Sequence, residues 1–185
     1  VRQDLYEDTG LVLEQAATPA QLQSLVEKNK PNFDYILIDG APHVNSVVRS
    51  MLLLSNLVIA PLAPSSVEIW SFKAFEGLIH QAEKFNKNLK SKICWNRVRR
   101  RVKSSHEHIE SVAKDSKLSA LKNQLTFRVA YMDSFAQGCS VYEWSDPVAS
   151  AEIWSLCSAI KRITNKLEPV KFSKSAVAQE FIKKG

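Results

Sequence analysis

The sequence is short of glycine and cysteine, and each shortage limits what the chain can do. Its five glycines stand apart from one another, at Gly10, Gly40, Gly77, Gly138 and Gly185. No segment can therefore form the glycine-rich turn whose backbone N–H groups cradle a triphosphate. The three cysteines include no C-x-x-C pair, so the sequence supports neither a disulfide framework nor a cysteine-rich metal site.

Long apolar runs are missing as well. No run approaches the roughly 18 residues that a membrane-spanning helix needs, and no charged-then-apolar leader opens the chain. Hydrophobic residues make up 45% of the 185 residues and charged residues 24%, a balance typical of a globular domain. We therefore expect a cytoplasmic protein with one domain and no association with a membrane.

Positive charge is in excess, with a formal net charge of +6. This sign suits a partner that carries negative charge, most often nucleic acid. Five of the cations fall within one run of seven residues: Arg97, Arg99, Arg100, Arg101 and Lys103. Such a run predicts a phosphate-binding surface. The alternative is a solvated basic loop that keeps the protein in solution.

Apolar residues recur in patterns that predict alternating helices and strands. Helices are predicted over 18–31, 44–54, 65–85, 105–124 and 146–167, and strands over 35–39, 56–64, 91–98 and 125–131. Thr18 and Asp146 are predicted N-caps, and Ser65 with Glu68 matches a capping box. The strands are nearly all apolar, so both faces of the sheet should be covered. This pattern predicts an α/β fold with a doubly wound, mostly parallel sheet and helices on both faces.

Three of the predicted strands end on residues suited to a ligand site. In a doubly wound sheet, ligands bind beyond the carboxyl ends of the strands, where the sequence places Asp39, Pro61 to Pro64, and Asn96 with Arg97. An apolar strand followed by an aspartate is the Walker B pattern, in which the carboxylate helps to hold Mg²⁺, usually through water. The alternative is that Asp39 caps the helix that follows.

Three longer motifs follow one another along the chain: "FDYILIDGAP" at 33–42, "SNLVIAPLAPSSVE" at 55–68 and "RVAYMDSFAQGCSVYEWSDP" at 128–147. Together they resemble the ParA/MinD family of deviant Walker A ATPases, and most closely its small plasmid-type, ParF-like branch. The likeness extends from Phe33 to Thr164. It implies a P-loop NTPase-like fold, ATP or ADP with Mg²⁺ as cofactors, and a nucleotide-dependent homodimer that binds DNA without sequence preference.

The resemblance also implies roles for single residues. Asp39 would position the water shell of Mg²⁺, and Gly40 would lie in the switch that senses the nucleotide. The base and ribose would be bordered by Pro61, Pro64, Asn96 and Arg97, with Asn96 against adenine. The alternatives are that the prolines only end a strand and that Asn96 bonds to its own turn. The surface for DNA would consist of Arg97, Arg99, Arg100, Arg101, Lys103 and Arg128.

One family element does not occur, because the glycine-rich phosphate loop that precedes these motifs in the family is missing from the sequence. We expect a further strand–loop–helix portion before Val1 in the complete protein, and no ATP hydrolysis by this chain alone. Residues 1–167 would then form an N-terminally incomplete ATPase domain, and residues 168–185 a basic C-terminal tail.

The expected function is that of a ParA-type partition ATPase, which segregates or positions a plasmid, a chromosome or another cargo. A ParB-like adaptor would stimulate hydrolysis, and the protein would associate with the nucleoid. Two alternatives stay open. The scaffold could be a non-catalytic DNA-binding or dimerisation module. It could also be a MinD-like membrane-positioning ATPase, although the C-terminal segment has few of the large apolar residues that a membrane helix requires.

Overall fold

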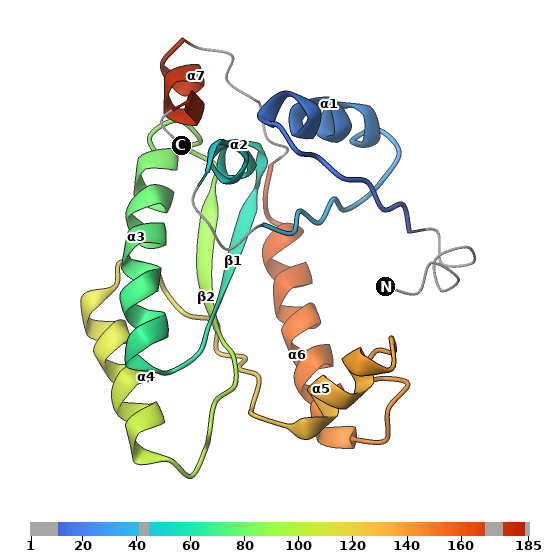
Figure 1. The fold of residues 1–185 in the computed structure, drawn as a ribbon, viewed down its shortest axis with the longest axis vertical. Coiled ribbons are helices and arrows are strands. Elements are labelled where there is room, and N and C mark those ends of the chain that lie inside the picture. The colour runs from blue at the N-terminus through green and yellow to red at the C-terminus, as the bar shows by residue number, and fades with distance from the viewer. Residues whose placement is uncertain (1–10, 41–44, 169–175, 184–185) are drawn as a thin grey trace. The chain divides into compact units, whose positions relative to one another are not determined.

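The computed structural model describes residues 11–40, 45–168 and 176–183. They form helices α1 (Pro19–Asn29), α2 (Ser46–Leu54), α3 (Ser66–Ala82), α4 (Lys103–Asp115), α5 (Val129–Ala136), α6 (Pro147–Thr164) and α7 (Ala176–Lys183), and strands β1 (Leu57–Leu62) and β2 (Lys90–Trp95). Figure 1 shows these elements, coloured along the chain. The predicted α/β class is confirmed.

The two strands are parallel neighbours in one sheet. At their beginnings the Lys90 N–H donates to the Asn56 carbonyl at 2.9 Å, and at their ends the Asn96 N–H donates to the Leu62 carbonyl, also at 2.9 Å. The strands therefore run in the same direction, as the sequence predicts. Within the described part of the chain, however, the sheet is narrower than expected.

A third extended segment lies along the other edge of β2, joined by single parallel bridges from Ile93 to Ala120 and from Val98 to Thr126. The strand predicted over 125–131 is thus wrong in its second half, because α5 begins at Val129. Aromatic and β-branched residues made this segment resemble a strand. The structure instead buries Ala130 and Ser134, one helical turn apart, so tertiary packing outweighs local preference.

The strand predicted over 35–39 is also wrong, since residues 33–40 belong to no helix or strand. Tyr35 is 57% exposed, Ile36 41% and Leu37 96%. A strand is stabilised by backbone hydrogen bonds to a neighbouring strand, and no strand among the described residues pairs with this segment. The apolar side chains of this segment, which the sequence predicted to be buried, are therefore exposed.

The chain divides into two compact units, and each is described by itself. The first contains residues 59–76 and 91–167, and the second contains the described residues of 10–58, 77–90 and 168–185. In the first unit, α3 and α4 lie on one side of the strands and α5 and α6 on the other (Figure 1). Its core includes Ile93, Val98 and Ala149, each at most 1% exposed.

The second unit is built from α1, α2 and α7. Thr18 caps α1 as predicted, with a reciprocal capping box to Gln21. The buried Asn86 amide lies 2.8 Å from the Ser55 carbonyl, just beyond the end of α2, and so satisfies a carbonyl that the helix leaves unpaired. Helix α7 packs on α2, with the Phe181 ring 5.4 Å from the ring of Phe85.

None of the helices in the described ranges combines the length and the apolar character that crossing a bilayer would demand.

Candidate nucleic-acid interface and nucleotide-site residues

Asp39 and Gly40 lie in the second unit. Asp39 is exposed and does not cap the next helix, because the side chain of Asn45 caps α2 by accepting from the Val48 N–H at 2.9 Å. The capping alternative for Asp39 is therefore wrong. A methyl group added at Gly40 would lie 2.6 Å from Cε of Met51, so the chain passes close to α2 at this glycine.

The residues at hand do not by themselves make a magnesium–nucleotide site. Asp39 offers one carboxylate, which is a ligand type that Mg²⁺ accepts. The described residues contain no cluster of three or more acidic, histidine or cysteine side chains that could hold a metal ion, and the sequence lacks a phosphate-cradling loop. Asp39 is thus a single component of the expected site.

The other predicted nucleotide residues lie in the first unit, at the carboxyl ends of β1 and β2. The hydrogen bond from Asn96 to Leu62 joins these two strand ends, which gathers Pro61, Pro64 and Asn96 at one edge of the sheet. The Asn96 side-chain oxygen accepts from the Arg97 N–H at 2.9 Å, which is the local turn contact expected if Asn96 bonds to its own turn. Contact with adenine stays a prediction.

Arg97 adopts a positive φ of 55°, the only such value at a non-glycine residue among those described. This left-handed conformation is costly for a residue with a side chain and is found most often at turns and functional sites. The turn redirects the chain from β2 into the basic run. The side chain of Arg97 is exposed.

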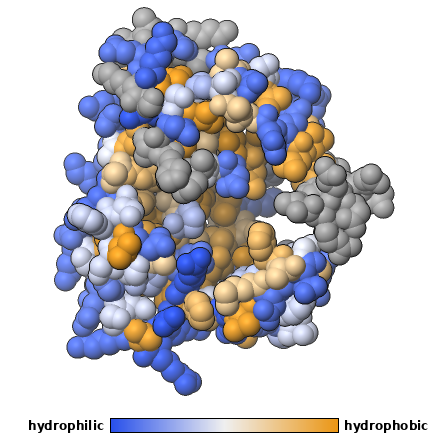
Figure 2. Space-filling view, viewed as in Figure 1, coloured by the Kyte–Doolittle hydropathy of each residue, from blue (hydrophilic) through white to orange (hydrophobic). Residues whose placement is uncertain are grey.

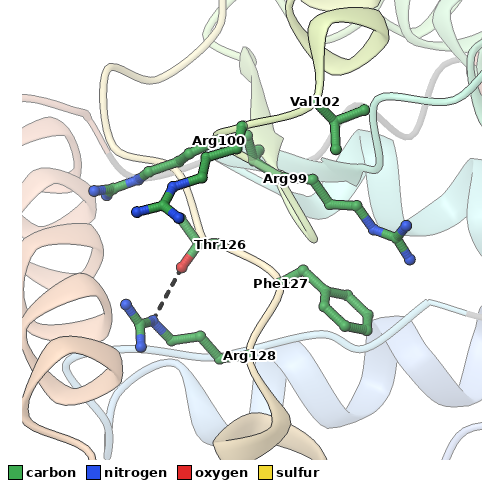
Figure 3. A pocket seen from close by; sticks show the side chains of 8 residues that line it. Arg99, Arg100, Val102, Thr126, Phe127 and Arg128 are labelled. Carbon is green, nitrogen blue, oxygen red and sulfur yellow. Dashed lines mark hydrogen bonds between the residues drawn. The ribbon is translucent and has the colours of Figure 1, made fainter.

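The basic run surrounds an open pocket of about 350 Å³ (Figure 3). Its walls come from two segments that the Val98–Thr126 bridge brings together: Val98, Arg99, Arg100, Arg101, Val102, Thr126, Phe127 and Arg128. The sequence predicted that Arg128 extends the surface formed by the run, and the structure places it in the same pocket. The bridge explains how residues so far apart in sequence meet.

Two arginines of the pocket are held by carboxylates of α6 and its cap. Arg100 lies 3.3 Å from Glu152, and Arg128 lies 3.2 Å from Asp146. Lys103, outside the pocket, forms an exposed pair with Glu107 at 3.4 Å. Within the described ranges, no ion pair involves Arg97, Arg99 or Arg101, so no carboxylate there neutralises their charges.

Glu152 was not predicted as part of this site. Its carboxylate is buried and accepts from the Thr126 N–H at 2.9 Å and from the Tyr131 hydroxyl at 3.0 Å. Burial, and then donation to Glu152, raise the pKa of Tyr131. The available sequence signal was that Glu152 falls on the buried stripe of α6, three residues after Ala149, where a carboxylate needs partners.

Asp146 caps α6 as predicted, by accepting from the N–H groups of Val148 and Ala149 at 3.0 Å. The hydrogen bond from Ala149, with a further contribution from the guanidinium of Arg128, lowers the pKa of Asp146. Arg128 also donates to the Thr126 hydroxyl at 3.1 Å, the dashed line in Figure 3. These contacts fix one wall of the pocket to the start of α6.

The opposite wall carries an aromatic ring. The guanidinium carbon of Arg99 lies 4.9 Å from the centroid of Phe127, a cation–π contact, and Figure 3 shows both side chains pointing to the same side. The backbone of the basic run is held by His106, whose Nε2 lies 2.8 Å from the Arg100 carbonyl. The pocket therefore combines free positive charge with an aromatic surface on a fixed backbone.

A family model described as an AAA domain matches residues 3–95, just over half of the chain. Maintenance of carboxysome distribution protein A from Halothiobacillus neapolitanus is 21% identical over 76% of this chain. Plasmid partition protein A from Escherichia coli is 31% identical over 26% of the chain and 12% of its own length. An uncharacterised protein from Methanocaldococcus jannaschii is 25% identical over 52% of the chain and 38% of its own length.

The chain belongs to the ParA/MinD family of ATPases. The family match includes Asp39, Pro61 and Pro64 but ends at residue 95, before the basic run. The chain spans 62% of the length of the Halothiobacillus neapolitanus protein. The family is thus shown, and the family match does not include the residues of the arginine pocket.

Proposed function

We propose that this chain is part of a ParA-type ATPase whose ATP-bound homodimer binds DNA without sequence preference and positions a cargo. Family membership supports the ATPase component. The names of the two relatives support the positioning component, since one concerns carboxysome distribution and the other plasmid partition. The cargo would be a DNA molecule or a protein body, recognised through a ParB-like adaptor, and the protein would associate with the nucleoid.

The observation that carries the DNA-binding component is the set of exposed arginines in the pocket and, at Arg97, just before it. Arg97, Arg99 and Arg101 have no carboxylate partner in the described part of the chain, whereas Arg100 and Arg128 are held by Glu152 and Asp146. Arginine forks match the oxygens of a phosphate. Contacts to phosphates position a protein on DNA but read no sequence, so this surface favours non-specific binding.

For the nucleotide, we propose that Asp39 holds the water shell of Mg²⁺ in the complete protein. The phosphate loop would come from outside these residues. The backbone conformation at Gly40 would change with the bound nucleotide. The close approach of Gly40 to Met51 would transmit this change to α2. The adenosine would be bordered by Pro61, Pro64, Asn96 and Arg97.

The decisive experiment measures binding of the complete protein to a duplex of random sequence with ATP, with ADP and without nucleotide. The proposal expects tight binding only with ATP, and a strong loss of affinity as salt rises. Equal affinity in all three conditions would support the alternative of a non-catalytic DNA-binding module.

A MinD-like membrane role is disfavoured by the packing of α7. A membrane-bound amphipathic helix presents its apolar face to lipid. Here Phe181 is 4% exposed and Ile182 6%, and Phe181 packs on Phe85 and under the guanidinium of Arg49. Flotation with anionic liposomes checks this, because a MinD-like protein would rise with the vesicles when ATP is present.

A further inference from the structure

Phe127 is an exposed aromatic residue on the wall of a cationic pocket. Its side chain is 45% exposed, although its backbone is fixed by donation from the Phe127 N–H to the Val98 carbonyl at 3.0 Å. One guanidinium, that of Arg99, lies over the ring. Arg99 is one of the arginines proposed above to meet duplex phosphates, whereas the Phe127 ring has no part in that contact.

The guanidinium of Arg99 covers one face of the ring, so the two groups already form a pair. Aromatic rings and guanidinium planes are both surfaces on which proteins stack an unpaired base. The pocket volume of about 350 Å³ lies near the lower end of the range for small-ligand sites, roughly 300–1,000 Å³. Because the pocket is open, one nucleotide of a longer strand can enter it. Arg101 lines the same pocket and is exposed, so it can meet the phosphate of that nucleotide.

Arg100 and Arg128 add a second, fixed pair of cations across Thr126 from this surface (Figure 3). Arg100 remains 61% exposed even though it is paired with Glu152, so some of its N–H donors stay open to a ligand. The pocket thus offers stacking on one side and hydrogen-bond donors to phosphate oxygens on the other.

We propose that this pocket binds an unpaired nucleotide of a single-stranded nucleic acid. The base extends the stack that Phe127 and the Arg99 guanidinium already form, and Arg101 contacts its phosphate. A base in a duplex is already stacked between its neighbours and cannot reach Phe127. The inference builds on the proposed function, because it uses the same basic surface, and it adds the form of nucleic acid that this surface prefers.

The experiment compares oligothymidylate with a duplex that carries the same number of phosphates, by fluorescence anisotropy of the complete protein. Phe127→Leu is expected to weaken binding of the single strand about tenfold and to change duplex affinity less than about twofold. The matched control is Phe135→Leu on α5, where the ring is 83% exposed; Figure 2 shows hydrophobic residues at the surface in this region. This control should change neither affinity.

Equal losses on both nucleic acids, or no loss on the single strand, would overturn the inference. Thermal melting of each variant shows whether it folds. If Phe127→Leu does not fold, Phe127→Trp takes its place, and oligothymidylate must then quench the added fluorescence. Displacement of the strand by thymidine monophosphate at equal concentration would identify a free-nucleotide site instead and would also overturn the inference.

These outcomes differ from a failure of the proposed function. Absence of ATP-dependent duplex binding by the unmodified protein would defeat the proposed function. The single-strand inference would then still be decided by the difference between Phe127→Leu and Phe135→Leu.

Discussion

The carboxylate of Glu152 lies 2.8 Å from the hydroxyl of Thr126, and this contact joins α6 to the segment that forms the pocket wall. The Thr126 hydroxyl in turn accepts from Arg128, and Glu152 also meets Arg100. Two of the pocket's cations are therefore positioned from a single buried acid. Removing that acid should disturb both stability and the shape of the pocket.

Glu152→Leu is expected to lower the free energy of unfolding by about 3 kcal/mol, because several donors lose a buried acceptor at once. Unfolding of the complete protein in urea measures this. Glu107→Leu on α4 is the matched control, since Glu107 is 59% exposed in its side chain and its loss should cost less than about 0.5 kcal/mol. Equal costs for the two variants would remove Glu152 from its positioning role.

The contribution of Asp146 to the free energy of unfolding should depend on pH. Its pKa is lowered in the folded protein from about 3.9 in the unfolded chain. This contribution is therefore fully present above about pH 4 and is lost as the pH falls through the folded value. Asp146→Asn keeps an N-cap but removes the charge.

The stability difference between the unmodified protein and Asp146→Asn should accordingly shrink as the pH falls below about 4. Urea unfolding at successive pH values measures it. A difference that stays constant over this range would mean that the charge of Asp146 and its pairing with Arg128 do not stabilise the fold.

Charge reversal at the free arginines should weaken duplex binding. Arg99→Glu with Arg101→Glu is expected to lower affinity and to reduce the slope of log K against log salt by about 0.9 for each phosphate contact removed. Lys114→Glu with Lys117→Glu, at exposed positions at the end of α4 and just beyond it, makes the same change in net charge and controls for it alone. If the two charge changes act alike, binding follows net charge and not this surface.

Asp39→Ala in the complete protein should abolish ATP hydrolysis, because the water shell of Mg²⁺ loses its carboxylate. The release of phosphate measures the rate. Asp133→Ala, at an exposed residue of α5, should leave the rate unchanged. If the Asp39→Ala protein still hydrolyses ATP, Asp39 has no part in the reaction.

Features set by neighbouring residues were predicted well from the sequence. The caps Thr18 and Asp146 are both confirmed, because a cap depends on a side chain and the N–H groups two or three residues on. Strands β1 and β2 were also predicted, since β1 is an apolar run and β2 ends in the apolar residues Ile93 to Trp95. Their parallel pairing followed from the alternation of helices and strands.

Features that depend on distant partners were not predicted. The segment around Ile36 has the composition of a strand, but a strand also needs a neighbour, which the residues described do not supply. The pocket likewise required the Val98–Thr126 bridge and the buried Glu152. The sequence predicted a phosphate-binding surface from these arginines. It did not distinguish Arg99 and Arg101 from Arg100 and Arg128, which pair with Glu152 and Asp146.

The packing of α7 has a consequence for the order in which the protein is made. The second unit draws on residues near 10–58, on 77–90 and on α7, and the buried Phe181 contacts Phe85 and Arg49 from earlier parts of the chain. At roughly 5–20 residues per second of synthesis, α2 waits on the order of ten seconds for α7 to emerge. During that interval the part of α2 that α7 covers is open, and a ribosome-associated chaperone would find its substrate there.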